Sequence, residues 1–127
     1  MTQNRPVNIN LLKIKLPLSA FLSITHRISG ILIFFIVLPV SVFIFSELTQ
    51  SQDSFNNFVI MYHKNLGIKF GCVGLILIFQ YHIFTGVRHI LMDFHILNES
   101  LSSSYKSAVT TLVLFAVNAL LTLWVML

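Results

Sequence analysis

The sequence predicts an all-α membrane protein with three transmembrane helices. Of its 127 residues, 56% are hydrophobic and only 9% are charged, so it carries more apolar surface than a water-soluble domain of this length can bury. Three stretches contain no Asp, Glu, Lys or Arg: residues 28–45, 70–87 and 107–127. Each has at least the roughly 18 residues that a helix needs to cross the hydrocarbon layer. We expect one transmembrane domain, residues 1–127, with spans at about 22–46, 67–92 and 106–127.

The first span follows a mixed tail, residues 1–16, and Pro17 suits the first turn of its helix. The tail lacks an apolar region with a small-residue cleavage site, so we expect no removable signal peptide. Pro39 has no N–H for the helix interior and is expected to bend the span. A short surface helix, or else ordinary loop packing, is expected where apolar residues recur at i, i+3, i+4 and i+7: Phe55, Phe58, Val59 and Tyr62.

The basic residues are distributed unevenly between the two sides of the membrane. Six belong to the tail, the start of span one and the connection between spans two and three: Arg5, Lys13, Lys15, Arg27, Arg88 and Lys106. Lys64 and Lys69 belong to the other side. The positive-inside rule predicts a cytoplasmic or matrix N-terminus and an external C-terminus. The net charge of +4 therefore reflects topology, and we expect no nucleic-acid partner.

A stripe of polar residues marks the end of span two. His82, Gly86, His89 and Asp93 fall on one helix face, and Arg88 points about a third of a turn away. His82 lies roughly 9 Å deeper than Arg88 by the helical rise, and an ionisable side chain inside the hydrocarbon usually marks a function. A hydrogen bond to a neighbouring helix is the alternative use of this imidazole.

A neutral imidazole at this depth is a suitable axial ligand for the iron of a b-type haem, and Gly86 would let the macrocycle lie close to the helix. His82 and His89 are roughly 10 Å apart on the same face, too far to hold one iron together. His26 is expected at the shallow level of His89. The second ligand is therefore expected on another polypeptide. A three-helix bundle is thin, and a partner chain is expected for that reason also.

A second polar cluster opens span one. Ser23, His26, Arg27 and Gly30 follow the helical repeat, and topology places them on the same membrane side as the first stripe. Arg27 is suited to a haem propionate or a quinone carbonyl, and Ser23 can donate to the same carbonyl. Snorkelling of Arg27 to lipid phosphates is the ordinary alternative.

Three segments together resemble a known family: "RPVNINL" at 5–11, "SITHRISG" at 23–30 and "YHIFTGVRHILMD" at 81–93. They are similar to the signature segments of the cytochrome b membrane-anchor subunit of succinate dehydrogenase, respiratory complex II. The resemblance covers the whole chain in length, span number and motif order. Thr25 stands where a large aliphatic residue is usual in that family.

The resemblance implies a role for each matching residue. His82 corresponds to the axial ligand of one haem b, shared with a second small anchor subunit. Ser23 and Arg27 match the ubiquinone site, and Asp93 matches an acid near it that is a candidate for proton delivery. The residues that match the vicinity of the haem propionates are His26, Arg27 and His89.

The resemblance also implies the assembly. The chain would be half of a haem-bridged anchor bundle that holds an iron–sulfur subunit and a flavoprotein subunit, and succinate oxidation would belong to those other subunits. Electrons from succinate would pass to ubiquinone in a bacterial inner membrane or, alternatively, a mitochondrial one. A haem-free membrane anchor and a proton-relay subunit of another complex are the alternative functions. Optical absorption by haem separates the first of these from the leading hypothesis.

Overall fold

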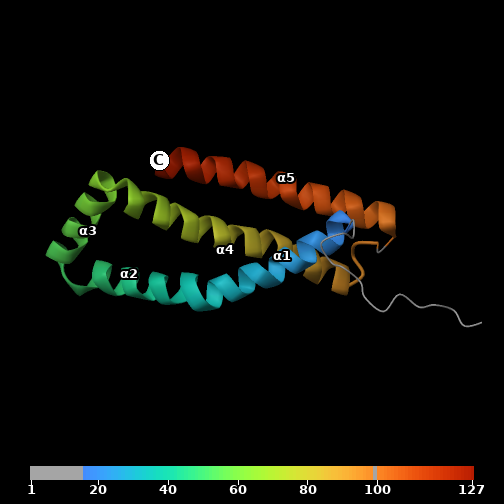
Figure 1. Ribbon diagram of the computed structural model, residues 1–127, viewed down its shortest axis with the longest axis horizontal. Coiled ribbons are helices and arrows are strands. Elements are labelled where there is room, and N and C mark those ends of the chain that lie inside the picture. Colours follow the sequence, from blue (N-terminus) through green and yellow to red (C-terminus); the bar gives the residue numbers. More distant parts are fainter. Residues whose placement is uncertain (1–15, 99) are drawn as a thin grey trace, which may run out of the picture.

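The computed structural model describes residues 16–98 and 100–127, and these form a bundle of helices (Figure 1). The segment "RPVNINL" at 5–11, one of the three that carry the family resemblance, lies outside the described residues. The helical elements are, in order, α1 (Leu18–Leu32), the π-helical turn η1 (Ile33–Val37), α2 (Leu38–Gln50), α3 (Gln52–Lys64), α4 (Leu66–Asp93) and α5 (Leu101–Met126). No strand occurs among the described residues, so the all-α prediction is confirmed.

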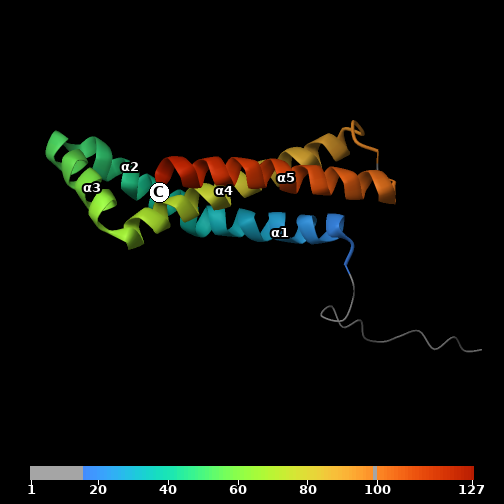
Figure 2. The same cartoon turned by 90° about the horizontal axis from the view of Figure 1, so that it is seen from above.

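Three helical stretches are long and apolar enough to cross a membrane: Leu18–Gln50, Leu66–Asp93 and Leu101–Met126. The expected number of spans is therefore confirmed, although the helices run past the expected limits. Both views show the start of α1, the end of α4 and the start of α5 at one end of the bundle (Figures 1 and 2). We call this the basic end, because Arg27, Arg88 and Lys106 belong to it. The short helix α3 and the C-terminus lie at the opposite end, the α3 end.

The first span is interrupted near its middle. Residues Ile33–Val37 form a π-helical turn, and Pro39 follows in the first turn of α2. Proline supplies no N–H to the ladder and its ring crowds the preceding turn, and a π turn is one of the ways in which a helix absorbs such a defect. Figure 1 shows the ribbon changing direction between α1 and α2, as Pro39 predicted.

The connection at the α3 end is shorter and more helical than expected. Only Ser51 separates α2 from α3, and its side chain caps α3 by accepting from the Ser54 N–H. Asn65 separates α3 from α4 and caps α4 in the same way. The predicted surface helix is therefore present. It begins at Gln52, before Phe55, the first residue of the predicted apolar pattern, because Ser51 caps it despite the polar composition of the segment. Lys69 Nζ also donates to the Leu127 carbonyl at 2.9 Å.

α4 is the central helix, since it contacts both α1 and α5. Few apolar side chains are buried within the chain: Leu22, Val37, Val73 and Ala108. Most large apolar side chains of the described residues are exposed, including Phe43 and Phe45 of α2. In lipid such exposure carries no penalty, so close packing and polar contacts must hold the helices together.

Candidate functional site

The crossing of α1 and α4 is built from two histidines and two glycines. A Cβ added to Gly30 would lie 3.3 Å from His82 Cε1, and a Cβ added to Gly86 would lie 3.1 Å from His26 Nε2. Each helix thus contributes a glycine that makes room for the imidazole of the other. The missing side chains allow both rings to enter the interface.

The three histidines of the two motifs form one row. The His26 and His82 rings stack with centroids 4.2 Å apart and planes 14° apart. His26 also lies 5.1 Å from the His89 ring, at a tilt of 46°. His26 is therefore between the other two, and nearer to His82 than the sequence suggested. The helix crossing places Gly30 opposite His82 and His26 opposite Gly86. His26 therefore lies between His82 and His89 rather than at the level of His89.

Ser29 fixes the orientation and tautomer of His82. Its hydroxyl donates to the His26 carbonyl at 2.6 Å, and its Oγ lies 2.9 Å from His82 Nδ1. A carbonyl oxygen can only accept, so the single hydroxyl proton goes to His26 and Oγ accepts from Nδ1–H of His82. The proton of the neutral imidazole then lies on Nδ1, which leaves the lone pair of Nε2 free for a metal. Ser29 is itself buried.

His26 holds the least satisfied polar atom of the row. Its Nε2 is buried and has no hydrogen-bond partner within the described residues. This atom lies beside Gly86. A buried nitrogen without a partner is costly, and such groups commonly mark a site that is completed by another molecule.

The remaining expected site residues lie around this row at the basic end. Arg27 is exposed and Ser23, one turn earlier, is half-buried. Asp93 is exposed at the end of α4, and both Asp93 and Arg27 interact electrostatically with His89. Expected residues from both motifs are thus gathered in one region.

Thr25 has a partner that explains its polarity. Its hydroxyl donates to the Phe21 carbonyl at 2.9 Å and forms a short hydrogen bond with the Tyr81 hydroxyl. Since the threonine proton goes to the carbonyl, the tyrosine is the donor. This bond joins α1 to α4 one residue before His82. The departure from a large aliphatic residue at position 25 is thereby compensated.

Sequence reasoning missed Ser29 and did not predict the hydrogen-bond partners of Arg88. Arg88 is only 3% exposed and donates from Nε to Ser107 Oγ at 3.1 Å and from one Nη to the Ser104 carbonyl at 3.2 Å. The signal for it was the serine-rich start of span three, "SLSSSYKS". The signal for Ser29 was its place three residues after His26, where it is free to bond that carbonyl.

Comparison with known proteins decides the family. The model of the succinate dehydrogenase/fumarate reductase transmembrane subunit family matches residues 1–124. The chain belongs to this family. The resemblance seen in the sequence motifs is thereby confirmed.

Relatives within the family agree with this assignment. The succinate dehydrogenase cytochrome b556 subunit of Coxiella burnetii is 36% identical over 93 residues, which cover 73% of this chain and 74% of that protein. The cytochrome b560 subunit of Porphyra purpurea is 34% identical over 112 residues, 87% of this chain and 88% of that one. The cytochrome b560 subunit of Chondrus crispus is 33% identical over 100 residues, 72% of each chain.

Proposed function

We propose that this transmembrane subunit supplies one axial ligand, His82, to a haem b and forms part of a ubiquinone site that receives electrons from succinate. The ligand assignment rests on the hydrogen bond between Ser29 and His82. This bond keeps the imidazole proton of His82 on Nδ1 and leaves the free lone pair on Nε2. From the rise per residue, His82 lies about 16 Å along the helix axis from the end of α4. Ring orientation fixed by an outer hydrogen bond is typical of metal-ligating histidines.

The second axial ligand is proposed to come from a partner anchor subunit. The His26 and His82 rings stack face to face, so these two side chains would not hold one iron between them. His89 is on the same helix as His82, two turns away. A partner histidine on the open side of α4 would satisfy the geometry and would tie the two subunits together.

The haem propionates are proposed to lie toward the basic end. His26 Nε2 is buried and has no hydrogen-bond partner within the described residues, so it is available to a propionate. His89 adjoins it, and Arg27 supplies a positive charge in the same region. Charge-assisted hydrogen bonds from such groups to carboxylates are the strong ones. Haem, when bound, supplies one-electron redox chemistry that no side chain of this subunit provides.

The quinone is proposed to bind beside Ser23 and Arg27, in agreement with what the family resemblance of the sequence motifs implies. Ser23 would donate to a quinone carbonyl, and Arg27 would stabilise the negative charge that develops on the quinone oxygens as electrons arrive. Protons have to follow those electrons. Asp93 is exposed at the same end and interacts with His89, so it is the proposed entry for protons.

The assembly is proposed to contain the second anchor subunit, an iron–sulfur subunit and a flavoprotein subunit, with succinate oxidised by the last two. The basic end would face the cytoplasm or matrix, since six basic residues of the sequence belong to that side. A bacterial inner membrane is the proposed location.

The ligand assignment is tested with His82→Leu in the purified complex. The native bis-imidazole haem spectrum should disappear, because leucine has no lone pair for iron. His63→Leu, on the exposed surface of α3, is the matched control and should leave the spectrum unchanged. An unchanged spectrum in the His82 variant would refute the assignment.

The quinone site is tested with Arg27→Leu. Quinone reduction should fall by about 100-fold, as expected for loss of a charged group that stabilises developing charge, while succinate oxidation with an artificial dye should persist. Equal losses in both assays would count against a direct role of Arg27. Lys64→Leu at the α3 end serves as the control for loss of a surface charge.

A further inference from the structure

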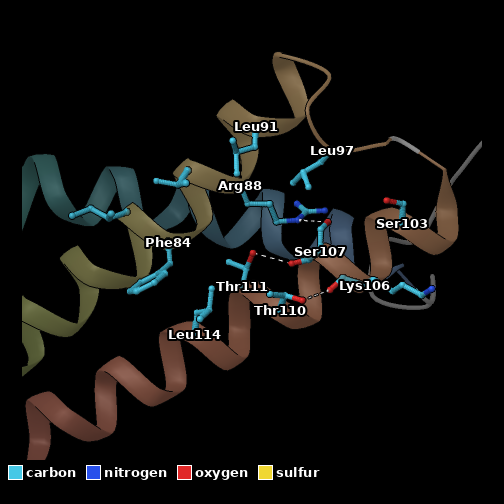
Figure 3. Close-up of a pocket in the computed structure, with 12 residues that line it drawn as sticks. Phe84, Arg88, Leu91, Leu97, Ser103, Lys106, Ser107, Thr110, Thr111 and Leu114 are labelled. Carbon is cyan, nitrogen blue, oxygen red and sulfur yellow. Dashed lines mark hydrogen bonds between the residues drawn. The ribbon is translucent and has the colours of Figure 1, made fainter.

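A cavity of about 520 Å³ lies between the end of α4 and the start of α5, and none of the histidines of the row lines it (Figure 3). Its charged lining residues are Arg88 and Lys106, and among the described residues that line it none is acidic. It is therefore a cavity with one sign of charge, at the basic end of the bundle. Neither the haem nor the quinone proposal uses it.

Arg88 is a buried cation whose partners are neutral. It is 3% exposed, and its hydrogen bonds go to the serine oxygens of Ser104 and Ser107 at 3.1 to 3.2 Å. Hydroxyl and carbonyl dipoles satisfy the N–H donors but leave the charge uncompensated. Burial of an uncompensated charge is costly, so such groups are normally paired with an anion.

The chain offers no described carboxylate for this pairing. Glu47 belongs to α2 near the α3 end, and Asp53 belongs to α3 itself. Asp93 is exposed at the end of α4 and interacts with His89. The remaining acid, Glu99, lies outside the described residues. The partner anion is thus to be sought outside the described part of the chain.

The lining changes from polar to apolar along the cavity. Figure 3 shows Arg88 and Lys106 toward one end, and Phe84 and Leu114 toward the other. Ile83, which also lines it, is 44% exposed and Leu114 is 53% exposed, so the apolar end opens on the outer surface of the helices. A ligand that fits has a negative head and a hydrocarbon tail.

We propose that this cavity binds the phosphate group of an anionic phospholipid, with Arg88 and Lys106 at the phosphate and one acyl chain along Ile83 and Leu114. Charge complementarity favours an anionic headgroup, because two cations meet no described acid. The depth of the cavity in the membrane also fits this ligand. It lies at the ends of transmembrane helices, where basic side chains meet lipid phosphates. The inference holds whether or not the haem and quinone proposals do.

The test uses the intact complex, delipidated in a neutral detergent and titrated in native mass spectrometry. Phosphatidylglycerol, phosphatidylcholine and inorganic phosphate are compared as ligands. Phosphatidylglycerol should bind at least about fivefold more tightly than phosphatidylcholine, because each basic residue near the surface contributes attraction for an anionic headgroup. Inorganic phosphate should compete weakly, since it lacks the tail.

Two variants locate the binding on the cavity. Lys106→Gln should weaken phosphatidylglycerol binding about fivefold, and Ile83→Trp should weaken it by filling the apolar end. Both side chains are exposed, so the complex should still assemble, which the subunit composition in the same mass spectra checks. Lys64→Gln, exposed at the α3 end, is the control and should bind lipid as the unchanged protein does.

The outcomes separate the possible ligands. Equal binding of both lipids, or equal binding by Lys106→Gln and the unchanged complex, would overturn the proposal. Full competition by inorganic phosphate together with no effect of Ile83→Trp would show a free-phosphate site instead, which also overturns it. Failure of any lipid to bind would likewise overturn the proposal.

Discussion

α4 packs against α1 on one side and α5 on the other, and the two contacts use different chemistry. The contact with α1 brings together imidazoles over two glycines. Each contact contains one buried polar atom without a partner within the described residues, His26 Nε2 toward α1 and Gln80 Oε1 toward α5. The contact with α5 uses hydrogen bonds between unlike polar groups, such as Gln80 Nε2 to Thr122 Oγ1 at 2.7 Å, and an edge contact between Tyr81 and Phe115.

This difference separates the histidine site from a scaffold contact around Gln80 and Thr122, which do not line the Arg88 cavity. At the α5 contact, polar donors of α4 reach serine and threonine oxygens on the facing helix, which holds two helices together in lipid. At the α1 contact, three ionisable rings lie close together, and glycines without side chains leave the space that the rings occupy. Ionisable rings inside a transmembrane bundle usually serve a function, and this is why we propose the haem at the α1 contact.

The largest effect is expected for Gly86→Leu. Its side chain would enter space held by the His26 ring, since even a Cβ there lies 3.1 Å from Nε2. Overpacking of a tight contact costs about 1–3 kcal/mol and sometimes more, so most of the complex should lose its haem absorbance during purification. Gly74→Leu is the matched change on the same helix, where an added Cβ meets no atom within 4 Å. Equal losses in the two variants would contradict the reciprocal glycine–histidine contact.

An intermediate effect is expected for Ser29→Ala. Without the hydroxyl, His82 Nδ1 loses the partner that sets its tautomer, and loss of an outer hydrogen bond typically weakens metal binding about 10–100-fold. Haem transfer from the complex to apomyoglobin should accelerate accordingly. Ser41→Ala, an exposed serine of the same span, should transfer haem at the unchanged rate. Retention of haem by both variants alike would rule out Ser29 as a positioning residue.

The smallest effect is expected for Thr122→Val at the α5 contact. It removes the acceptor of the Gln80 side chain, and such interhelical hydrogen bonds contribute on the order of 0.6 kcal/mol. The midpoint of thermal unfolding should fall slightly with no change in the haem spectrum. A double-mutant cycle with Gln80→Leu measures the coupling. A changed spectrum would contradict the assignment of this contact to the scaffold.

The number and nature of the spans could be predicted from the sequence because lipid imposes a simple rule on length and polarity. The limits of the connections could not. Ser51 and Asn65 cap adjoining helices, so a segment that looks like a polar loop is helical almost throughout. Single capping residues decide such boundaries, and composition does not reveal them.

The sequence could predict that the histidines lie near one another but not the register of their helices. Helical periodicity put His82 and His89 on one face, yet the position of His26 beside His82 depends on how α1 is shifted along α4. That register follows from the glycines at positions 30 and 86, which face imidazoles across the interface. The partners of Arg88 required knowledge of which serines of α5 lie opposite.

The most direct test of the central claim, that His82 ligates haem iron through Nε2, is the midpoint potential of the haem in His82→Met. Methionine keeps a ligand at this position but replaces an imidazole nitrogen by a thioether, and methionine–histidine ligation raises the potential relative to two histidines. The complex should therefore retain haem and show a higher potential, whereas the control His63→Met should not. A potential and spectrum identical to those of the unchanged complex would contradict ligation by His82.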